Sequence, residues 1–222
     1  MMKILFIGNS ATYVHEIPQT LQWLAGQSGH PIEIGQITPG GCELAMHANA
    51  ETEHGQRVLR EIAKGYDVVF LQDNGNCISC EEKREACIRA CRELSARVWE
   101  SGGVPYLYVR PPYGRDAFGR SPWEQCVSFD ALFTEIGREN GAVCAYVNRA
   151  FAYAMKNLPY ELWGEDHAHT SPHGAYLAVC VFYTTLFGTS AMGLSPNGLS
   201  TVEALMLRNV ANKIVLEQYC PW

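Results

Sequence analysis

The chain has 222 residues, and its 17 Lys and Arg against 23 Asp and Glu give a formal net charge of −6. Hydrophobic residues make up 47% and charged residues 18%, which is typical of a globular chain and excludes wholesale disorder. The acidic balance, without any cluster of five basic residues, argues against a nucleic-acid partner. A chain of this length is expected to fold as one domain, over residues 1–222. No apolar run approaches the roughly 18 residues of a membrane span, so we expect no span.

The N-terminus superficially resembles a signal peptide because Lys3 precedes the apolar run Ile4–Ile7. That run is too short for the hydrophobic region of such a peptide, so we expect a cytoplasmic protein. The nine cysteines are then expected to be thiols, and their odd number already argues against a complete disulfide framework.

Short β-branched segments alternate along the chain with longer segments of helical periodicity. The predicted strands are Ile4–Ile7, Ile32–Ile37, Val68–Leu71, Val104–Val109 and Val143–Val147. The predicted helices lie near Ile17–Gln27, Glu51–Ala63, Glu81–Glu100, Trp123–Glu139, Pro172–Phe187 and Thr201–Glu217. This alternation predicts an α/β fold, a three-layer α/β/α domain whose parallel sheet of about five strands is covered on both faces by helices.

Small and polar residues follow the predicted strands, and ligands of such sheets bind beyond the carboxyl ends of the strands. We therefore expect one edge of the sheet to gather Gly8–Ser10, Thr38–Cys42, Gln72–Asn76, Arg110–Gly114 and, after a further short helix, Asp166–His169.

Ser10 would be a poor nucleophile unless a base took its proton. A histidine can do this at neutral pH when a carboxylate fixes its tautomer and stabilises the imidazolium. Asp166 and His169, three residues apart on a tight turn, supply both partners. Candidate donors to an oxyanion are the backbone N–H groups of Ser10 and Gly41 and the side-chain amide of Asn74. A glycine suits such a position because the backbone must approach the ligand closely.

In this order, a Gly-x-Ser near the start, a glycine, an asparagine and a late Asp-x-x-His resemble the SGNH (GDSL-type) hydrolase superfamily. The resemblance covers nearly the whole chain, from Ile4 to about Val181. It implies a flavodoxin-like sandwich and an esterase, lipase, thioesterase or carbohydrate deacetylase that needs no cofactor. It also implies that Ser10, Asp166 and His169 form the triad, and that Gly41 and Asn74 complete the oxyanion hole.

Two blocks depart from the family pattern. Asn9 stands where the family usually has Asp, but its side chain is short and can still form hydrogen bonds. The third block reads Gln-Asp-Asn-Gly-Asn instead of Gly-x-Asn-Asp, so Asn76 is an alternative to Asn74. Gly40 is likewise an alternative to Gly41.

Two further histidines compete with His169 for the role of base. His167 directly follows Asp166, and adjacent side chains usually diverge; His173 lies one residue after Pro172, where we expect a polar or capping group. Three histidines and two acids in this segment could suggest a metal site, but the sequence offers no matching ligand pair elsewhere, so we expect no metal.

The spacing Cys77-x-x-Cys80, followed by Cys87 and Cys91, resembles a ligand set for zinc or an iron–sulfur cluster. A simpler interpretation is that Cys87 and Cys91 belong to the buried stripe of an amphipathic helix, together with Leu94 and Val98. The roles of Cys77 and Cys80 stay open.

Four further residues, Tyr13, Arg110, Tyr113 and Trp163, lie in or beside the loops that should surround the crevice. They would suit a sugar ring or an acyl chain, although ordinary packing explains any one of them equally well. The irregular stretch YGRDAFGRSPW is expected to be a loop on the substrate side.

The sequence thus predicts a serine esterase that forms an acyl-enzyme, with a small-molecule ester as its partner. Short acyl groups, especially acetyl on carbohydrates, follow from the family resemblance only. One alternative is a flavodoxin-like protein that binds phosphate or flavin at the Gly8–Thr12 turn, and another is an inactive relative that binds glycans. The sequence does not specify the acyl group, the alcohol, an acceptor other than water, or the oligomeric state.

Overall fold

Five parallel strands form one sheet in the computed structural model, which describes residues 1–222. Their order across the sheet is β2-β1-β3-β4-β5, so the chain builds outward from β1 first on one side and then on the other. The loops after β1 and β3 therefore meet where the strand order reverses, which is where sheets of this kind bind ligands. The strands are β1 Met2–Ile7, β2 Ile32–Ile37, β3 Val68–Leu71, β4 Val104–Val109 and β5 Val143–Tyr146.

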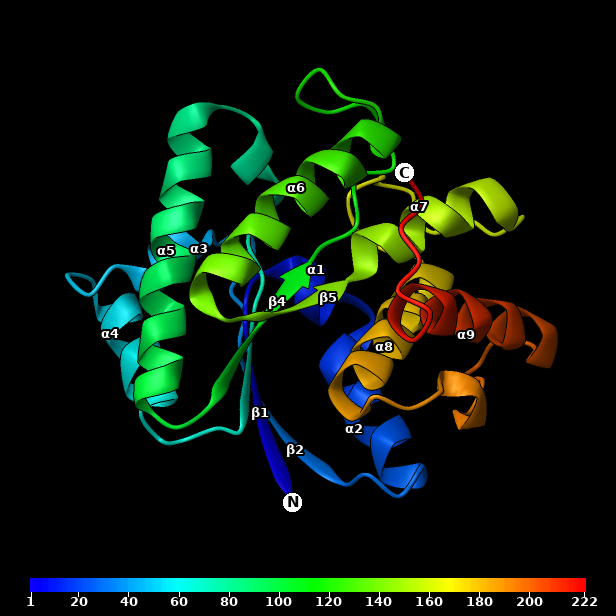
Figure 1. Ribbon diagram of the computed structural model, residues 1–222, viewed down its shortest axis with the longest axis horizontal. Coiled ribbons are helices and arrows are strands. Elements are labelled where there is room, and N and C mark those ends of the chain that lie inside the picture. Colours follow the sequence, from blue (N-terminus) through cyan, green and yellow to red (C-terminus); the bar gives the residue numbers. More distant parts are fainter.

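Helices cover both faces of the sheet (Figure 1). On one face pack α2 Ile17–Gln27, α7 Val147–Asn157, α8 Pro172–Phe187 and α9 Thr201–Val215. On the other pack α3 Leu44–Ala48, α4 Glu53–Ile62, α5 Glu81–Glu100 and α6 Pro122–Asn140. A single helical turn, α1 Ser10–Tyr13, follows β1, and 3₁₀ turns lie at Val14–Glu16, Gly75–Ile78 and Ala191–Gly193. The predicted three-layer α/β/α sandwich is confirmed.

Successive side chains of a strand point to opposite faces of the sheet, so each strand contributes alternately to the two hydrophobic cores. In β1, Ile4 and Phe6 join the core beneath α2 and α8, whereas Leu5 and Ile7 join the core beneath α4 and α5. All four side chains are fully buried. Because both faces are covered, these strands read as continuous apolar runs.

Local signals explain where two of the long helices, α6 and α8, begin and end. Ser121 and Glu124 form a capping box at the start of α6, and Gly141, with φ +64°, ends that helix. Ser171 caps α8, which ends at Gly188 with φ +60°. The predicted bounds of α2, α5 and α8 agree with the structure.

Other predicted bounds need correction. Strand β5 ends at Tyr146, because Val147 already begins α7 without an intervening loop. Helix α9 ends at Val215 and not at Glu217. The sequence did not predict α3, whose five residues are too few to show a helical period.

The predicted cysteine stripe of α5 is confirmed, since Cys87, Cys91, Leu94 and Val98 are all buried. None of the nine cysteines is paired in a disulfide. No helix combines the length and the apolar character that a bilayer crossing requires.

Candidate active site

The proposed nucleophile, Ser10, is the first residue of α1, at the carboxyl end of β1. Asn9 caps this short helix: its Oδ1 accepts the N–H of Ala11 at 3.0 Å, and its Nδ2 donates to the carbonyl of Cys42 at 2.8 Å. An aspartate here could accept the first bond but could not donate the second. The departure from the family pattern at Asn9 therefore ties the nucleophile turn to the loop after β2.

Gln72, the residue directly after β3, stabilises the same turn through its side chain. Its buried Oε1 accepts the N–H of Asn9 at 3.0 Å and the hydroxyl of Thr12 at 2.9 Å. A Cβ on Gly8 would lie 2.6 Å from this oxygen, so only glycine fits between β1 and Gln72.

His47, on α3, supports the turn from a third direction. Its Nε2 lies 2.9 Å from the carbonyl oxygen of Gly8, and its side chain is fully buried. Burial lowers the pKa of His47 to about 4, so the ring is neutral at physiological pH. Because a carbonyl can only accept, Nε2 carries the proton, and Nδ1 is free to accept from Nε2 of His54 at 3.0 Å.

The Asp166–His169 segment brings its two side chains to Ser10. His169 Nε2 lies 2.9 Å from Ser10 Oγ, and His169 Nδ1 lies 2.6 Å from Asp166 Oδ2. The other carboxylate oxygen accepts the backbone N–H groups of Ala168 at 2.9 Å and of His169 at 3.0 Å. These hydrogen bonds, from the backbone and ring of His169 and the backbone of Ala168, hold the pKa of Asp166 well below its usual range.

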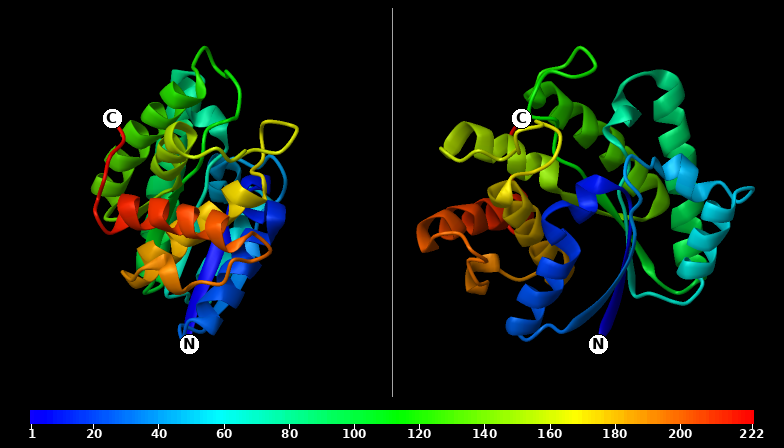
Figure 2. Two further views of the ribbon diagram at one scale, coloured as in Figure 1. Left: turned by 90° about the vertical axis from the view of Figure 1, so that its right-hand side faces the viewer. Right: turned by 180° about the vertical axis from the view of Figure 1, so that it is seen from behind.

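The loop that carries this pair is closed by bonds between its own two ends. Trp163 and Thr170 form an antiparallel bridge, and the N–H of Gly164 donates to the carbonyl of His169 at 2.9 Å. One backbone hydrogen bond joins the loop to the segment after β4, from the N–H of Gly114 to the carbonyl of His167 at 2.8 Å. Figure 2 shows this loop, in yellow, at the end of the molecule opposite the N-terminus, where the strands have their carboxyl ends.

Gly41 and Asn74 lie in adjacent loops. Asn74 Nδ2 donates to the carbonyl of Gly41 at 3.1 Å, while Asn74 Oδ1 faces the backbone N–H of Asn76 at 3.3 Å and the hydroxyl of Tyr113 at 3.5 Å. Gly41 has φ +71°, a conformation that favours glycine. The amide of Asn76 instead points to Glu43, with Nδ2 3.4 Å from the carboxylate.

The four residues predicted to contact substrate differ in their surroundings. Tyr13 is 41% exposed, whereas Trp163 is buried and donates its Nε1–H to the carbonyl of Pro112 at 2.8 Å. Arg110 is also buried; its guanidinium lies 4.4 Å from the ring centroid of Tyr113, and its Nε donates to the carbonyl of Pro111. Tyr113 is half-buried and reaches Asn74.

The remaining sequence candidates separate from Ser10. His173 pairs with Glu203 at 3.1 Å and stacks on Tyr160. His167 is exposed, with φ +53°. Cys80 is exposed on the surface, apart from the buried group formed by Cys77, Cys87 and Asp73.

Two residues that support the nucleophile turn were not predicted. Gln72 stands directly after a predicted strand, so its position marked it, but its amide had no partner visible in the sequence. No local pattern pointed to His47, because its contact with Gly8 joins residues far apart in the chain.

No family model matches this chain, and no curated protein sequence does. Solved structures do match. A protein from Slackia heliotrinireducens, described as "a putative SGNH hydrolase", is 26% identical, with a TM-score of 0.70 over 83% of this chain and 98% of that one. A DUF4886 family protein from Bacteroides uniformis is 17% identical, with a TM-score of 0.80 over 98% and 95%.

An acetylxylan esterase from Geobacillus stearothermophilus is 17% identical, with a TM-score of 0.64 over 84% of this chain and 94% of that one. The TM-scores of these matches, between 0.64 and 0.80, show that they share the fold of this chain. The resemblance predicted from the sequence is thus confirmed, and the chain has the fold of the SGNH-type hydrolase superfamily.

Proposed function

We propose that this chain is a serine hydrolase that cleaves carboxylic esters through a Ser10–His169–Asp166 triad. The observation that carries the proposal is the continuous chain of hydrogen bonds from Ser10 Oγ through His169 to Asp166, at 2.9 and 2.6 Å. A separation below 3 Å between nucleophile and base is the geometry that proton transfer requires.

In the first step, His169 takes the proton of Ser10 while Oγ attacks the ester carbonyl. Asp166 accepts the Nδ1–H of His169, which leaves Nε2 unprotonated and directed at Oγ. The ionised carboxylate then stabilises the imidazolium that forms. The low pKa of Asp166 keeps it ionised throughout the neutral and mildly acidic range.

The negative charge on the carbonyl oxygen needs donors that are fixed before the reaction. As the first helical residue of α1, Ser10 has a backbone N–H without an intrahelical acceptor. The N–H of Gly41 and the second amide hydrogen of Asn74 complete the proposed set. We prefer Asn74 to Asn76 as the side-chain donor because the amide of Asn76 is directed at Glu43. We prefer Gly41 to Gly40 as the backbone donor because the side chain of Asn74 bonds to the carbonyl of Gly41.

In the second step, the imidazolium gives its proton to the departing alkoxide, so the alcohol leaves and an acyl-Ser10 ester remains. Water then attacks this ester, with His169 again as base. The acid is released and Ser10 regains its proton, so the protein returns to its starting state without a cofactor.

The proposed substrates are acetyl esters of carbohydrates or similar small molecules. Two of the matched proteins, represented by four structures, carry the name acetylxylan esterase, which supports an acetylated sugar. The exposed ring of Tyr13 and the half-buried ring of Tyr113 offer the flat apolar surfaces that sugar rings prefer. A flavin- or phosphate-binding role would leave the paired Asp166 and His169 without a function.

The test is hydrolysis of p-nitrophenyl acetate, butyrate and octanoate, and release of acetate from acetylated xylo-oligosaccharides. A fluorophosphonate probe should label one residue, and peptide mass spectrometry should place the label on Ser10. Ser10→Ala and His169→Ala should abolish both turnover and labelling, whereas Ser79→Ala, at an exposed serine, should change neither. Turnover that survives in both active-site variants would overturn the proposal.

A further inference from the structure

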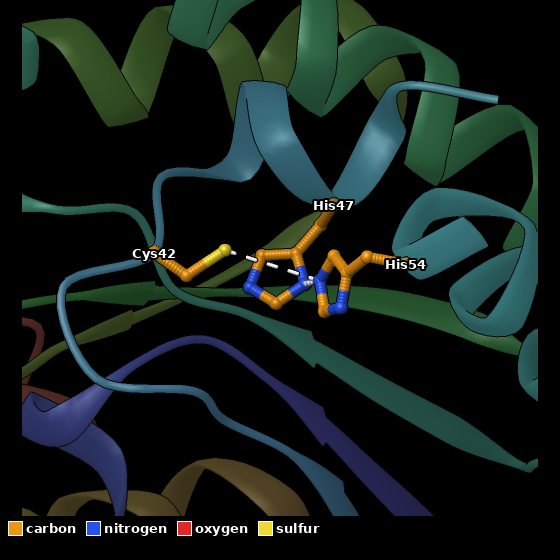
Figure 3. Close-up of side chains that lie close together, drawn as sticks. All are labelled: Cys42, His47 and His54. Atoms are coloured by element: carbon orange, nitrogen blue, oxygen red, sulfur yellow. Dashed lines mark hydrogen bonds between the residues drawn. The ribbon is translucent and has the colours of Figure 1, made fainter. Parts of the chain in front are cut away.

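A cysteine and two histidines lie together beneath the loop that follows β2. Cys42 belongs to that loop, His47 to α3, and His54 to α4. One potential metal-ligating atom from each residue lies within 4.8 Å of those of the other two. Figure 3 shows the three side chains close together, with dashed lines that join the thiol of Cys42 to the imidazole of His54 and the imidazole of His54 to that of His47. Nothing in the proposed ester hydrolysis uses the thiol or His54.

The distances suit a tetrahedral zinc ion. With Zn–N of about 2.0 Å and Zn–S of about 2.3 Å, two nitrogen ligands lie about 3.3 Å apart, and a nitrogen and a sulfur about 3.5 Å apart. Here His47 Nδ1 and His54 Nε2 are 3.0 Å apart, and His54 Nε2 and Cys42 Sγ are 3.9 Å apart. A shift of about 0.3 Å in the first distance and about 0.4 Å in the second would reach the tetrahedral values.

His47 also makes the supporting hydrogen bond that a zinc-ligating histidine commonly makes. A ligating histidine commonly donates its other ring N–H to a carbonyl or carboxylate, which fixes its tautomer and orientation. His47 already does this, because its Nε2–H is held by the carbonyl of Gly8 at 2.9 Å. The lone pair of Nδ1 is thereby directed at the other two side chains.

A cavity of about 550 Å³ gives access to the cluster from solvent. Cys42 and His54 line it, together with Pro39, Gly40, Gly41, Met46, Asn49 and Thr52. An ion can therefore enter, and a water molecule can occupy the fourth coordination position from the cavity side. Three protein ligands and one open position are typical of sites where zinc keeps a water ligand.

We propose that Cys42, His47 and His54 bind one zinc ion. As the ion binds, the thiol of Cys42 releases its proton to solvent and becomes a thiolate ligand. His54 gives up its Nε2 proton to solvent and takes one from solvent on Nδ1, so that Nε2 coordinates the ion in place of the hydrogen bond that joins the two imidazoles. Mixed sulfur and nitrogen ligands favour zinc over magnesium or calcium, which prefer oxygen.

The bound ion would connect two segments of the proposed active site. Cys42 directly follows Gly41, and its carbonyl accepts the Asn9 amide. His47 holds the carbonyl of Gly8. Zinc would thus fix the loop of the proposed oxyanion donor against the nucleophile turn.

The test uses the full-length protein after treatment with a chelator. Isothermal titration with Zn²⁺ should show one ion per chain, and the thermal midpoint should rise with added zinc. Titration with Co²⁺ should give the visible bands of a tetrahedral ion and a near-ultraviolet band from thiolate-to-cobalt charge transfer. No saturable binding in the wild type, or a cobalt spectrum without the thiolate band, would overturn the proposal.

Variants identify the ligands. Cys42→Ser and His54→Ala should each weaken Zn²⁺ binding by at least about 100-fold, and Cys42→Ser should remove the thiolate band. His47 is left unchanged because it also supports Gly8. Cys80→Ser, at an exposed thiol, and Cys77→Ser, in the second buried group, are matched controls that should keep both affinity and spectrum. Loss of the site in either control, with full binding in Cys42→Ser, would place the metal elsewhere and refute the proposal.

Discussion

The two halves of the candidate active site are held in place in different ways. The nucleophile turn depends on side chains distant in sequence, since Asn9 bonds to Gln72 and Cys42, and Gly8 bonds to His47. The loop of the acid–base pair is closed almost entirely by its own backbone. Gln72 and His47 are fully buried, whereas the side chain of Asp166 is 52% exposed.

Because of this difference, we expect substitutions in the two halves to affect different properties, the catalytic rate in one half and the stability of the fold in the other. The fold must be complete before Ser10 is correctly placed, because its supports come from three other segments. Asp166 and His169 instead lie on a self-contained loop, and substituting them removes no buried contact. We therefore expect variants of the loop to lose rate while staying folded, and variants beneath the nucleophile turn to lose stability.

The largest effect is expected for the nucleophile and the base themselves. Ser10→Ala and His169→Ala should each lower kcat by roughly 10⁴- to 10⁶-fold, and the double variant should cost little more, because the two groups act as one unit. The thermal midpoint should move by less than about 2 °C in each, because neither side chain is buried. Steady-state kinetics and calorimetry on the same preparations measure both. Additive losses in the double variant would mean that the two residues act independently.

The next effect is that of Asp166. Asp166→Asn keeps an oxygen that can accept the N–H groups of Ala168 and His169, so the loop should retain its shape. It removes the charge that stabilises the imidazolium, and kcat should fall roughly 10³- to 10⁴-fold.

The pH dependence sharpens this prediction. Because the folded-state pKa of Asp166 is lowered, its stabilising contribution is present above the unfolded pKa of about 3.9 and is lost only as the pH falls through the lower folded value. Asp166 should therefore add no step of its own to the kcat/KM profile of the wild type at mildly acidic pH. A second ionisation at mildly acidic pH, present in the wild type and absent from Asp166→Asn, would contradict a carboxylate that is already ionised there.

A smaller loss is expected at the oxyanion donor. Asn74→Ala should lower kcat roughly 100- to 1,000-fold while KM changes little, because the donor acts on charge that develops in the transition state. Asn76→Ala is the matched control: its amide faces Glu43, and we expect less than a 5-fold effect, as for a side chain without a role in the transition state. If the two variants exchanged behaviour, Asn76 would be the donor.

The sequence predicted the fold well because its signals are local. The apolar runs ending in Gly8 and Gln72 marked strands buried on both faces, and Pro172 and Gly188 marked the ends of α8. The Asp166–His169 spacing was also informative, because a turn of four residues determines most of its own geometry. The distances from Asp166 to His169 and from His169 to Ser10 could be known only from the structure.

Contacts between distant segments could not be predicted in this way. The carbonyl of Gly8 meets His47, and Cys42 meets His54, only after β2 has paired with β1 and α3 has packed against the sheet. Neither histidine lies in a motif. The burial of Arg110 and Trp163 likewise depends on how the loops after β4 and α7 pack on each other, which strand and helix patterns do not report.

Gln72 offers the smallest and most specific test of the comparison between the two halves. Gln72→Leu has a similar volume but no acceptor, so the N–H of Asn9 and the hydroxyl of Thr12 would be buried without partners. Leaving such donors unsatisfied should cost about 2 kcal/mol, which for a chain of this size lowers the thermal midpoint by roughly 4 to 8 °C. Asp166→Asn, measured beside it, should leave the midpoint nearly unchanged. If Gln72→Leu were as stable as the wild type, the nucleophile turn would be as self-contained as the loop of Asp166 and His169.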